Sequence, residues 1–217
     1  MISLSLVVLL FTFNPKTSVV MARTMFAPGI LWFCGVSLEV SGTENLSKKE
    51  SYVFVANHLS YVDIPALFRA IPKGLHFVAK KEIRLVPFIG WYMIATGMIF
   101  VDRSNKQKAV ASLDRAGKLI KKGKDVLMFP EGTRSKTGEV GVFKKGPFML
   151  AAKADIAVVP VAVVGTDQVL SPKSFVIRPH KVKIKIGKPN RIVGSDMRSF
   201  VEFNRMQTIQ LQKELDT

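Results

Sequence analysis

His58 and Asp63 are the two side chains in this sequence whose types and spacing best suit acid–base chemistry. The apolar run from Tyr52 to Ala56 is rich in β-branched and aromatic residues, which predicts a buried strand that ends just before His58. On one continuous helix the five-residue spacing would turn the two side chains ~140° apart. Contact between them therefore requires a turn, which Leu59 to Tyr61 can form before a helix that starts near Asp63.

This arrangement has two interpretations. In the first, Asp63 accepts the proton on one ring nitrogen of His58 and leaves the other nitrogen free as a base. In the second, the segment is a polar turn in which Asp63 only caps the following helix. The spacing alone does not decide between them.

The segment around His58 is the first of four blocks along the chain. It reads Asn57-His58-x4-Asp63, and it is followed by Gly-Met-Ile-Phe-Val-Asp-Arg at 97–103, Phe-Pro-Glu-Gly-Thr-Arg-Ser at 129–135 and Val-Val-Pro-Val at 158–161. In their types and order these blocks resemble the motifs of the glycerolipid acyltransferases, above all the 1-acylglycerol-3-phosphate acyltransferases. The similarity spans about residues 50 to 165, and four blocks in the family's order are far more specific than one.

The resemblance implies that the chain transfers a fatty acyl group from acyl-CoA or acyl carrier protein to lysophosphatidic acid, which gives phosphatidic acid. The catalytic residues that it implies are His58 and Asp63. The residues that it assigns to acceptor binding are Lys80, Arg103, Glu131, Gly132, Thr133 and Arg134. The family places a lysine after the second strand; Lys80 matches that position best, but Lys81 is adjacent and the choice stays open.

The residue types at 131–134 are consistent with phosphate binding. Arg134 offers a planar fork of donors, Gly132 lets the backbone approach closely, and Thr133 adds a hydroxyl. Taken without the other blocks, the same residues fit a surface turn with an ion pair between Glu131 and Arg134.

The sequence favours direct attack of the acceptor hydroxyl on the thioester. It contains no Gly-x-Ser-x-Gly elbow, and its only cysteine, Cys34, lies far from the blocks in an apolar segment. Ser60 as a nucleophile is the less favoured alternative. Three scattered histidines and one cysteine give no metal-ligand spacing, so neither a metal nor an organic cofactor is expected.

The composition indicates an anionic, apolar partner. The 217 residues include 32 Lys and Arg against 16 Asp and Glu, a formal net charge of +16, and 48% of them are hydrophobic. A basic chain that is also this apolar fits an anionic phospholipid membrane better than a nucleic acid, and no nucleic-acid partner is expected. A basic module that binds anionic lipid or nucleic acid without chemistry remains the alternative to an enzyme.

Residues 1–38 are the most apolar part of the chain and are expected to form a two-helix hairpin embedded in one leaflet, which the family is also known for. The run from Ile2 to Phe13 would be only ~18 Å long as a helix, and the run from Val19 to Val36 is interrupted by Arg23 and by Pro28-Gly29. A cleaved signal peptide and a single span are the alternatives. The short N-terminus favours a bacterial inner membrane, with the active site facing the cytoplasm.

Residues 39–217 are expected to form one α/β domain with a mostly parallel or mixed central sheet flanked by helices, because strand and helix patterns alternate. The further expected strands are Ser37 to Val40, Leu75 to Ala79, Met98 to Val101, Asp125 to Phe129, Ile156 to Val164 and Lys181 to Ile186. The expected helices are Val62 to Ala70, Ser104 to Lys122, Lys144 to Ala154 and 199–217. The segment from Ile83 to Thr96 is helix-like but broken by Pro87 and Gly90. Pro160 predicts a bulge or an edge in its strand, and His76 is expected to be a packed or edge histidine and not a catalytic one.

The resemblance favours a 1-acylglycerol-3-phosphate O-acyltransferase. An acyltransferase that acts on glycerol-3-phosphate or on another lysolipid uses the same motifs and is the nearest alternative. The broad apolar face of residues 83–96 is consistent with core packing or with a groove for an acyl chain.

Overall fold

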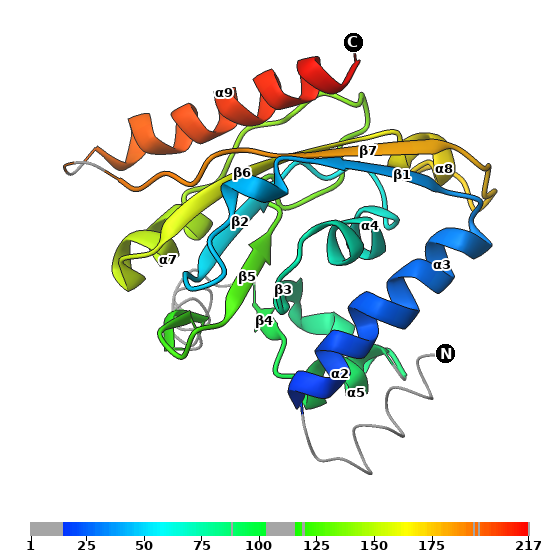
Figure 1. Ribbon diagram of the computed structural model, residues 1–217, viewed down its shortest axis with the longest axis horizontal. Helices are drawn as coiled ribbons and strands as arrows, with labels where there is room; N and C mark the ends of the chain where they lie inside the picture. Colours follow the sequence, from blue (N-terminus) through cyan, green and yellow to red (C-terminus); the bar gives the residue numbers. More distant parts are fainter. Residues whose placement is uncertain are drawn as a thin grey trace.

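The computed structural model describes residues 15–87, 89–102, 116–118, 120–192, 194 and 196–216. Their centre is a seven-stranded sheet with the order β1-β7-β6-β2-β5-β3-β4 (Figure 1). Every neighbouring pair is parallel except β6 and β7, which are antiparallel. The expected mixed sheet within one α/β domain is therefore confirmed.

The strands lie close to the expected segments. They are β1 (Ser37–Ser41), β2 (Tyr52–Ala56), β3 (Leu75–Lys80), β4 (Ile99–Val101), β5 (Asp125–Met128), β6 (Ala157–Val164) and β7 (Lys181–Ile186). The helices are α2 (Pro15–Met21), η1 (Ala22–Phe26), α3 (Ala27–Phe33), η2 (Thr43–Asn45), α4 (Asp63–Ala70), η3 (Lys81–Leu85), α5 (Ile89–Ala95), α7 (Gly146–Ala154), α8 (Thr166–Val169) and α9 (Met197–Asp216).

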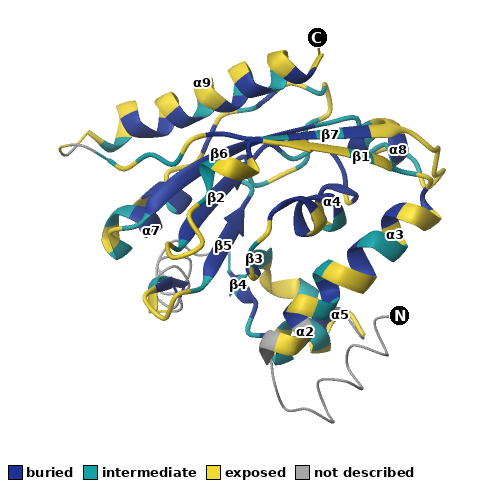
Figure 2. Ribbon diagram, viewed as in Figure 1, coloured by how far each residue is buried: buried dark blue, intermediate teal, exposed yellow. Residues whose placement is uncertain are grey.

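Helices cover both faces of the sheet, and the alternation of side chains along β2 shows how. Tyr52 and Phe54 pack in one core cluster with α3 and α4, whereas Val53 and Val55 pack in a second cluster with α7 and α9. All five residues of β2 are buried (Figure 2). Because both faces are covered, the central strands are apolar at every position and not at every second one.

Pro160 lies in an interior strand, and a bulge accommodates it, as predicted. Val161 pairs with Ile186, but Val158 forms its bridge with Asn190. Three steps along β6 thus match four steps along the neighbouring segment, which is one extra residue. Pro160 has no N–H to donate on this side, and its carbonyl accepts a hydrogen bond from the backbone N–H of Gly187 at 2.8 Å.

The described part of the N-terminal segment differs from the expectation at Pro28-Gly29. Helix α2, the π-helical η1 and α3 follow one another without a gap from Pro15 to Phe33, so the expected break is wrong. Pro28 lies in the first turn of α3, directly after η1. Proline prevents regular α-helical pairing with the preceding turn, and the wider π-helical turn relieves that conflict without ending the helix.

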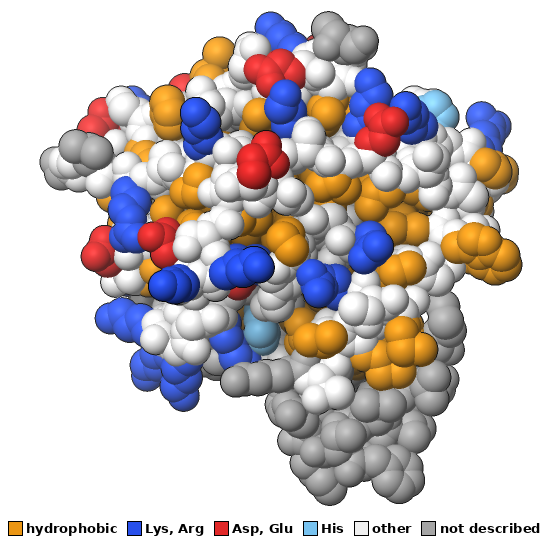
Figure 3. Space-filling model, viewed as in Figure 1, with side chains coloured by type: hydrophobic (Ala, Val, Ile, Leu, Met, Phe, Trp, Pro, Cys, Tyr) orange, Lys and Arg blue, Asp and Glu red, His pale blue; other side chains and the backbone are white. Residues whose placement is uncertain are grey.

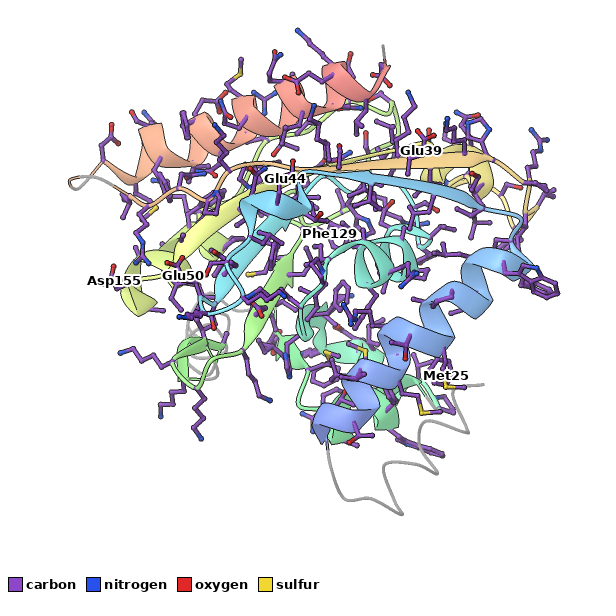
Figure 4. All side chains as sticks on the ribbon, in the orientation of Figure 1. Met25, Glu39, Glu44, Glu50, Phe129 and Asp155 are labelled. Atoms are coloured by element: carbon purple, nitrogen blue, oxygen red, sulfur yellow. The ribbon has the colours of Figure 1, made fainter. Side chains whose placement is uncertain are left out.

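This helical segment packs on the α/β domain. Ala22, Phe26, Ala27 and Leu31 are buried in the same cluster as residues of α4, and Met25 lies on the opposite side, away from the sheet (Figure 4). The expected boundary between residues 38 and 39 falls inside β1, which pairs with β7. Among the described residues, no helix is long and apolar enough to cross a bilayer. The first helix of the predicted hairpin lies outside the described residues.

Two other expected helices have different outcomes. The segment from Ile83 to Thr96 is broken around Pro87, as expected: the 3-10 helix η3 ends at Leu85 and α5 begins at Ile89, and α5 includes Gly90 without a second break. The predicted helix from Ser104 to Lys122 lies largely outside the described residues. Its described end contains the buried residues Ala116 and Ile120.

Two buried titratable side chains lie on adjacent strands at the end of the sheet where the parallel strands begin. Burial, with a smaller effect of Lys124, lowers the pKa of His76 to about 4. Burial raises the pKa of Asp125 to about 6, against the opposing effects of Lys73 and of the backbone N–H of Tyr52. His76 is a packed histidine, as expected, and its Nδ1–H donates to the carbonyl of Gly74 at 3.0 Å.

These shifts predict opposite pH dependences of stability for two variants. As the pH falls from about 6.5 to about 4, the unfolded state protonates His76 more than the folded state, which destabilises the fold. Over nearly the same range the folded state protonates Asp125 more than the unfolded state, which stabilises it. Asp125→Asn should therefore become more stable relative to wild type as the pH rises. His76→Gln should become more stable relative to wild type as the pH falls. Each change in relative stability should be on the order of 2 kcal/mol. Urea unfolding at about pH 4.5 and about pH 7 measures both. If the free energy of unfolding of both variants changed with pH just as that of the wild type does, the expectation would be contradicted.

Candidate active site

The structure brings His58 and Asp63 into direct contact. His58 follows β2 directly after Asn57, α4 begins at Asp63, and the turn between them lets Nδ1 of His58 lie 2.6 Å from Oδ2 of Asp63. A carboxylate can only accept, so the bridging proton belongs to Nδ1 and leaves Nε2 as an acceptor. The side chain of His58 is 15% exposed and that of Asp63 is fully buried. The histidine is thus held from the interior and open to the surface on one side.

Asp63 is fixed by further donors. Its Oδ2 also accepts hydrogen bonds from the backbone N–H groups of Leu59 at 2.7 Å and Ser60 at 2.9 Å. Its Oδ1 accepts a hydrogen bond from the hydroxyl of Thr166, which follows β6. A buried carboxylate needs such partners, and four of them prevent rotation away from His58. The residue is therefore more than a helix cap, and the N-cap position of α4 is Val62.

The side chains of Ser60 and Asn57 form hydrogen bonds with backbone groups. The buried hydroxyl of Ser60 donates to the carbonyl of Leu170 at 2.7 Å, so its proton has a structural partner. The side-chain amide of Asn57 pairs with the backbone of Val163. Its Nδ2 donates to the carbonyl of Val163, and its Oδ1 accepts from the N–H of Val163. Asn57 continues the pairing between β2 and β6 beyond the last residue of β2. It thereby fixes the point at which His58 leaves the sheet.

The loop after β5 encloses His58 from a second side. The ring of Phe129 stacks on the imidazole with ring centroids 3.9 Å apart and planes inclined by 14°. The backbone N–H of His58 donates to Oε1 of Glu131 at 2.9 Å, and the N–H of Ser135 donates to the carbonyl of His58 at 2.7 Å. Ring and backbone of the histidine are thus both held by this loop.

Glu131 joins two loops through its two carboxylate oxygens. Its second oxygen, Oε2, accepts from the N–H of Gly141 at 3.1 Å. A β-carbon at Gly141 would lie 2.9 Å from that oxygen, so a larger residue there would push the carboxylate out of this position. Burial raises the pKa of Glu131, while the N–H groups of His58 and Gly141 act against the rise. The carboxyl group therefore faces the protein backbone.

The rest of the Glu131–Arg134 turn faces outward. Gly132 has φ of +77°, a left-handed conformation that favours glycine, and Thr133 is exposed. The guanidinium carbon of Arg134 lies 3.9 Å from the centre of the Tyr61 ring, in the turn between His58 and Asp63. This cation–π contact replaces the ion pair with Glu131 that was the alternative interpretation. It places a cationic fork beside the histidine.

Lys80, the last residue of β3, and Lys81, the first residue of η3, have different partners. Nζ of Lys81 lies 2.8 Å from Oδ2 of Asp102, and this hydrogen bond raises the pKa of Lys81. Nζ of Lys80 lies 3.5 Å from Glu82 in an exposed pair. Strand β3 is two places from β2 in the sheet, which is roughly 10 Å at the spacing of neighbouring strands. Arg103 lies outside the described residues.

Sequence reasoning assigned no role to Asn57, Phe129 or Thr166 beyond their places in the blocks or strands. Asn57 and Phe129 flank predicted site residues in the quoted blocks. Thr166 lies outside all four blocks, and the signal that points to it is its place just after the end of a buried strand, where α/β sheets collect ligand-binding side chains.

The fold and this geometry define an α/β domain with a carboxylate-held histidine at the ends of its parallel strands. A model of the Acyltransferase family matches residues 37–164, from β1 to the end of β6. The chain therefore belongs to the Acyltransferase family.

Its relatives are glycerolipid enzymes. It is 40% identical over 187 residues to the 1-acyl-sn-glycerol-3-phosphate acyltransferase of Saccharomyces cerevisiae, which covers 83% of this chain and 61% of the yeast protein. It is 40% identical over 154 residues to the chloroplastic 1-acyl-sn-glycerol-3-phosphate acyltransferase LPAT1 of Arabidopsis thaliana, covering 70% and 43%. The chain thus spans less than two thirds of these relatives.

A solved structure is also similar. The crystal structure of the 1-acyl-sn-glycerophosphate (LPA) acyltransferase PlsC from Thermotoga maritima superposes with a TM-score of 0.83 at 29% sequence identity. The match covers 94% of this chain and 81% of that protein.

Proposed function

We propose that this chain transfers a fatty acyl group from a thioester, acyl-CoA or acyl carrier protein, to the free hydroxyl of 1-acylglycerol 3-phosphate and so forms phosphatidic acid. The observation that carries the proposal is the contact between His58 and Asp63, which leaves Nε2 of an accessible imidazole free to accept a proton. The names of the relatives support the choice of acceptor.

The reaction proceeds by general-base catalysis. Nε2 of His58 removes the proton of the acceptor hydroxyl as its oxygen attacks the thioester carbonyl, and Asp63 stabilises the imidazolium. The tetrahedral intermediate then expels the thiolate, which takes the proton back from Nε2. The new ester bond replaces the thioester bond, and no metal or organic cofactor is needed.

Arg134 and Lys80 bind the phosphate of the acceptor in this proposal, with Thr133 as an added donor. Both cations follow strands on the β5 side of His58, and a planar guanidinium suits a phosphate. Arg103, at the end of the 97–103 block, is a further proposed contact. Glu131 and Gly132 shape the loop, and Glu131 acts through the backbone of His58.

The protein works at the surface of an anionic membrane, on its cytoplasmic face. The net charge of +16 supports this part of the proposal. The outer side of the α2–α3 segment also supports it, because Val20, Met25, Trp32 and Phe33 are each more than half exposed. Hydrophobic side chains gather on the right of the face in Figure 3, where α3 ends.

The test is a panel of acceptors with purified protein in detergent or vesicles. Acyl transfer to 1-acylglycerol 3-phosphate should exceed transfer to glycerol 3-phosphate and to lysophosphatidylcholine. Preference for either of the other acceptors would move the assignment to that substrate. Transfer to none of them would refute it.

Arg134→Ala should raise the Michaelis constant for 1-acylglycerol 3-phosphate about tenfold, because a charged hydrogen bond to phosphate is lost. Tyr61→Phe keeps the aromatic face under the guanidinium and should change little, whereas Tyr61→Ala should shift the constant in the same direction as Arg134→Ala. Steady-state kinetics with varied acceptor measure this. Arg69→Ala, an exposed arginine near the end of α4, is the matched control. An unchanged constant in Arg134→Ala would argue against the phosphate contact.

A further inference from the structure

A pocket of about 430 Å³ adjoins the loop that carries His58, and the proposed chemistry has so far not used it. Its walls come from Leu59, from residues 135–138 after β5, and from α8 with the segment that follows it to Arg178. Leu59 directly follows His58, and the N–H of Ser135 donates to the carbonyl of His58. The pocket and the imidazole therefore share one loop.

In the order of the strands, the α8 wall of the pocket and Lys80 lie on opposite sides of His58, whereas the 135–138 wall belongs to the loop after β5 that also carries Arg134. In the order of the sheet, β6 is next to β2 on one side, and β5 and then β3 follow on the other. The α8 wall follows β6, His58 follows β2, and Lys80 ends β3. An acceptor phosphate held by Lys80 leaves the β6 side of the histidine open for a second substrate.

The lining of the pocket is polar and partly cationic. Hydrogen-bonding side chains predominate on its walls, and they are Ser135, Thr137, Asp167, Gln168, Ser171 and Ser174. Lys136 and Arg178 add two exposed positive charges, and the apolar contribution is limited to Leu59, Pro172 and Val176. Such walls suit a ligand that carries amides, hydroxyls and a phosphate, and they do not suit an alkyl chain.

We propose that this pocket binds the phosphopantetheine arm of the acyl donor. The inference rests on the proposed function, because a thioester must reach the carbonyl position beside Nε2 of His58. The arm contains two amides and a hydroxyl, which match hydroxyl, carboxamide and carboxylate partners, and it ends in a phosphate for Lys136 and Arg178. Coenzyme A and acyl carrier protein both present this arm.

The kinetic test compares donors that differ only at the phosphate. In the double variant Lys136→Ala/Arg178→Ala, the Michaelis constant for S-palmitoyl phosphopantetheine should rise about tenfold or more, while that for S-palmitoyl pantetheine stays unchanged. Palmitoyl-CoA and palmitoyl acyl carrier protein should both show the rise. Lys173→Ala, an exposed lysine of the same segment outside the pocket wall, is the control and should behave like wild type.

Three outcomes would overturn the assignment: equal constants for wild type and double variant, a rise for the lysophosphatidic acid acceptor in place of the donor, or a rise with palmitoyl-CoA alone. The last would indicate contacts with the nucleotide part, which the carrier protein lacks.

An equilibrium measurement separates this inference from the proposed function. Calorimetric titration with coenzyme A and with 4′-phosphopantetheine needs no catalysis. Weaker binding of both to the double variant supports the pocket even if no acceptor is acylated, in which case only the proposed function fails. Acyl transfer by the wild type with equal binding to both proteins would refute the pocket and leave the function intact.

Discussion

Replacing His58 with alanine is expected to lower kcat for acyl transfer about 10³-fold, the usual contribution of a positioned general base. Nε2 of this imidazole is left free by the contact between Nδ1 and Asp63, and the variant removes both nitrogens. The fold should survive, because the side chain is partly exposed and the backbone contacts with Glu131 and Ser135 do not need it. Release of thiol from palmitoyl-CoA, with 1-acylglycerol 3-phosphate as acceptor, measures the loss.

A control variant and a binding assay show whether the loss of activity in His58→Ala is a loss of catalysis. His180→Ala removes an exposed imidazole elsewhere and should leave the rate unchanged. Sedimentation with anionic vesicles should be the same for wild type and His58→Ala. A basic lipid-binding module without chemistry predicts no transfer by either protein, and retained transfer by His58→Ala would exclude His58 as the base.

Asp63→Asn is expected to lower kcat by about 10² to 10⁴-fold. Oδ2 of Asp63 accepts hydrogen bonds from Nδ1 of His58 and from the backbone N–H groups of Leu59 and Ser60. An asparagine that turns its oxygen toward these donors presents its amide to Thr166, and the imidazolium loses the negative charge that stabilises it. The same variant turned the other way points an N–H group at His58. The first orientation leaves Nε2 free but lacks the charge that stabilises the imidazolium, and the second favours the tautomer that carries its proton on Nε2, which removes the base.

A graded variant and a control separate catalysis from folding. Thr166→Val removes only the hydroxyl that donates to Oδ1 and should lower kcat by about tenfold. Asp155→Asn changes an exposed aspartate at the far left of Figure 4 and should have no effect on the rate. Thermal unfolding followed by circular dichroism shows whether each variant is folded. A folded Asp63→Asn with the wild-type rate would contradict the role of Asp63.

The sheet could be predicted from the sequence because its central strands carry strong local signals. The apolar runs that became β2 and β6 are buried on both faces, and the alternation from Lys181 to Ile186 became β7. Even the bulge at Pro160 follows from the missing N–H. The contact between His58 and Asp63 could also be predicted as one of two interpretations, because a short turn between a strand and a helix can bring two side chains five residues apart together.

Other contacts had no local signal. Thr166 reaches Asp63 across 103 positions of the chain, and Asn57 reaches Val163 across 106. The resemblance assigns Glu131 to acceptor binding, and only the fold shows that the N–H groups of His58 and Gly141 also donate to its two oxygens. The stacking of Arg134 on Tyr61 likewise joins two blocks that the spacing leaves unconnected.

The pairing of β1 with β7 affects how the protein can be shortened. One way to shorten the protein is to delete the apolar residues 1–38. This deletion would remove Leu31 and Cys34 from the core, together with the first two residues of β1. The start of β7, at Lys181 and Val182, would then lose its partners, and only three residue pairs would hold the shortened β1 on this edge of the sheet. Such a truncation invites aggregation, and a soluble version is better sought by exchanging Trp32 and Phe33 for polar residues while keeping the backbone whole.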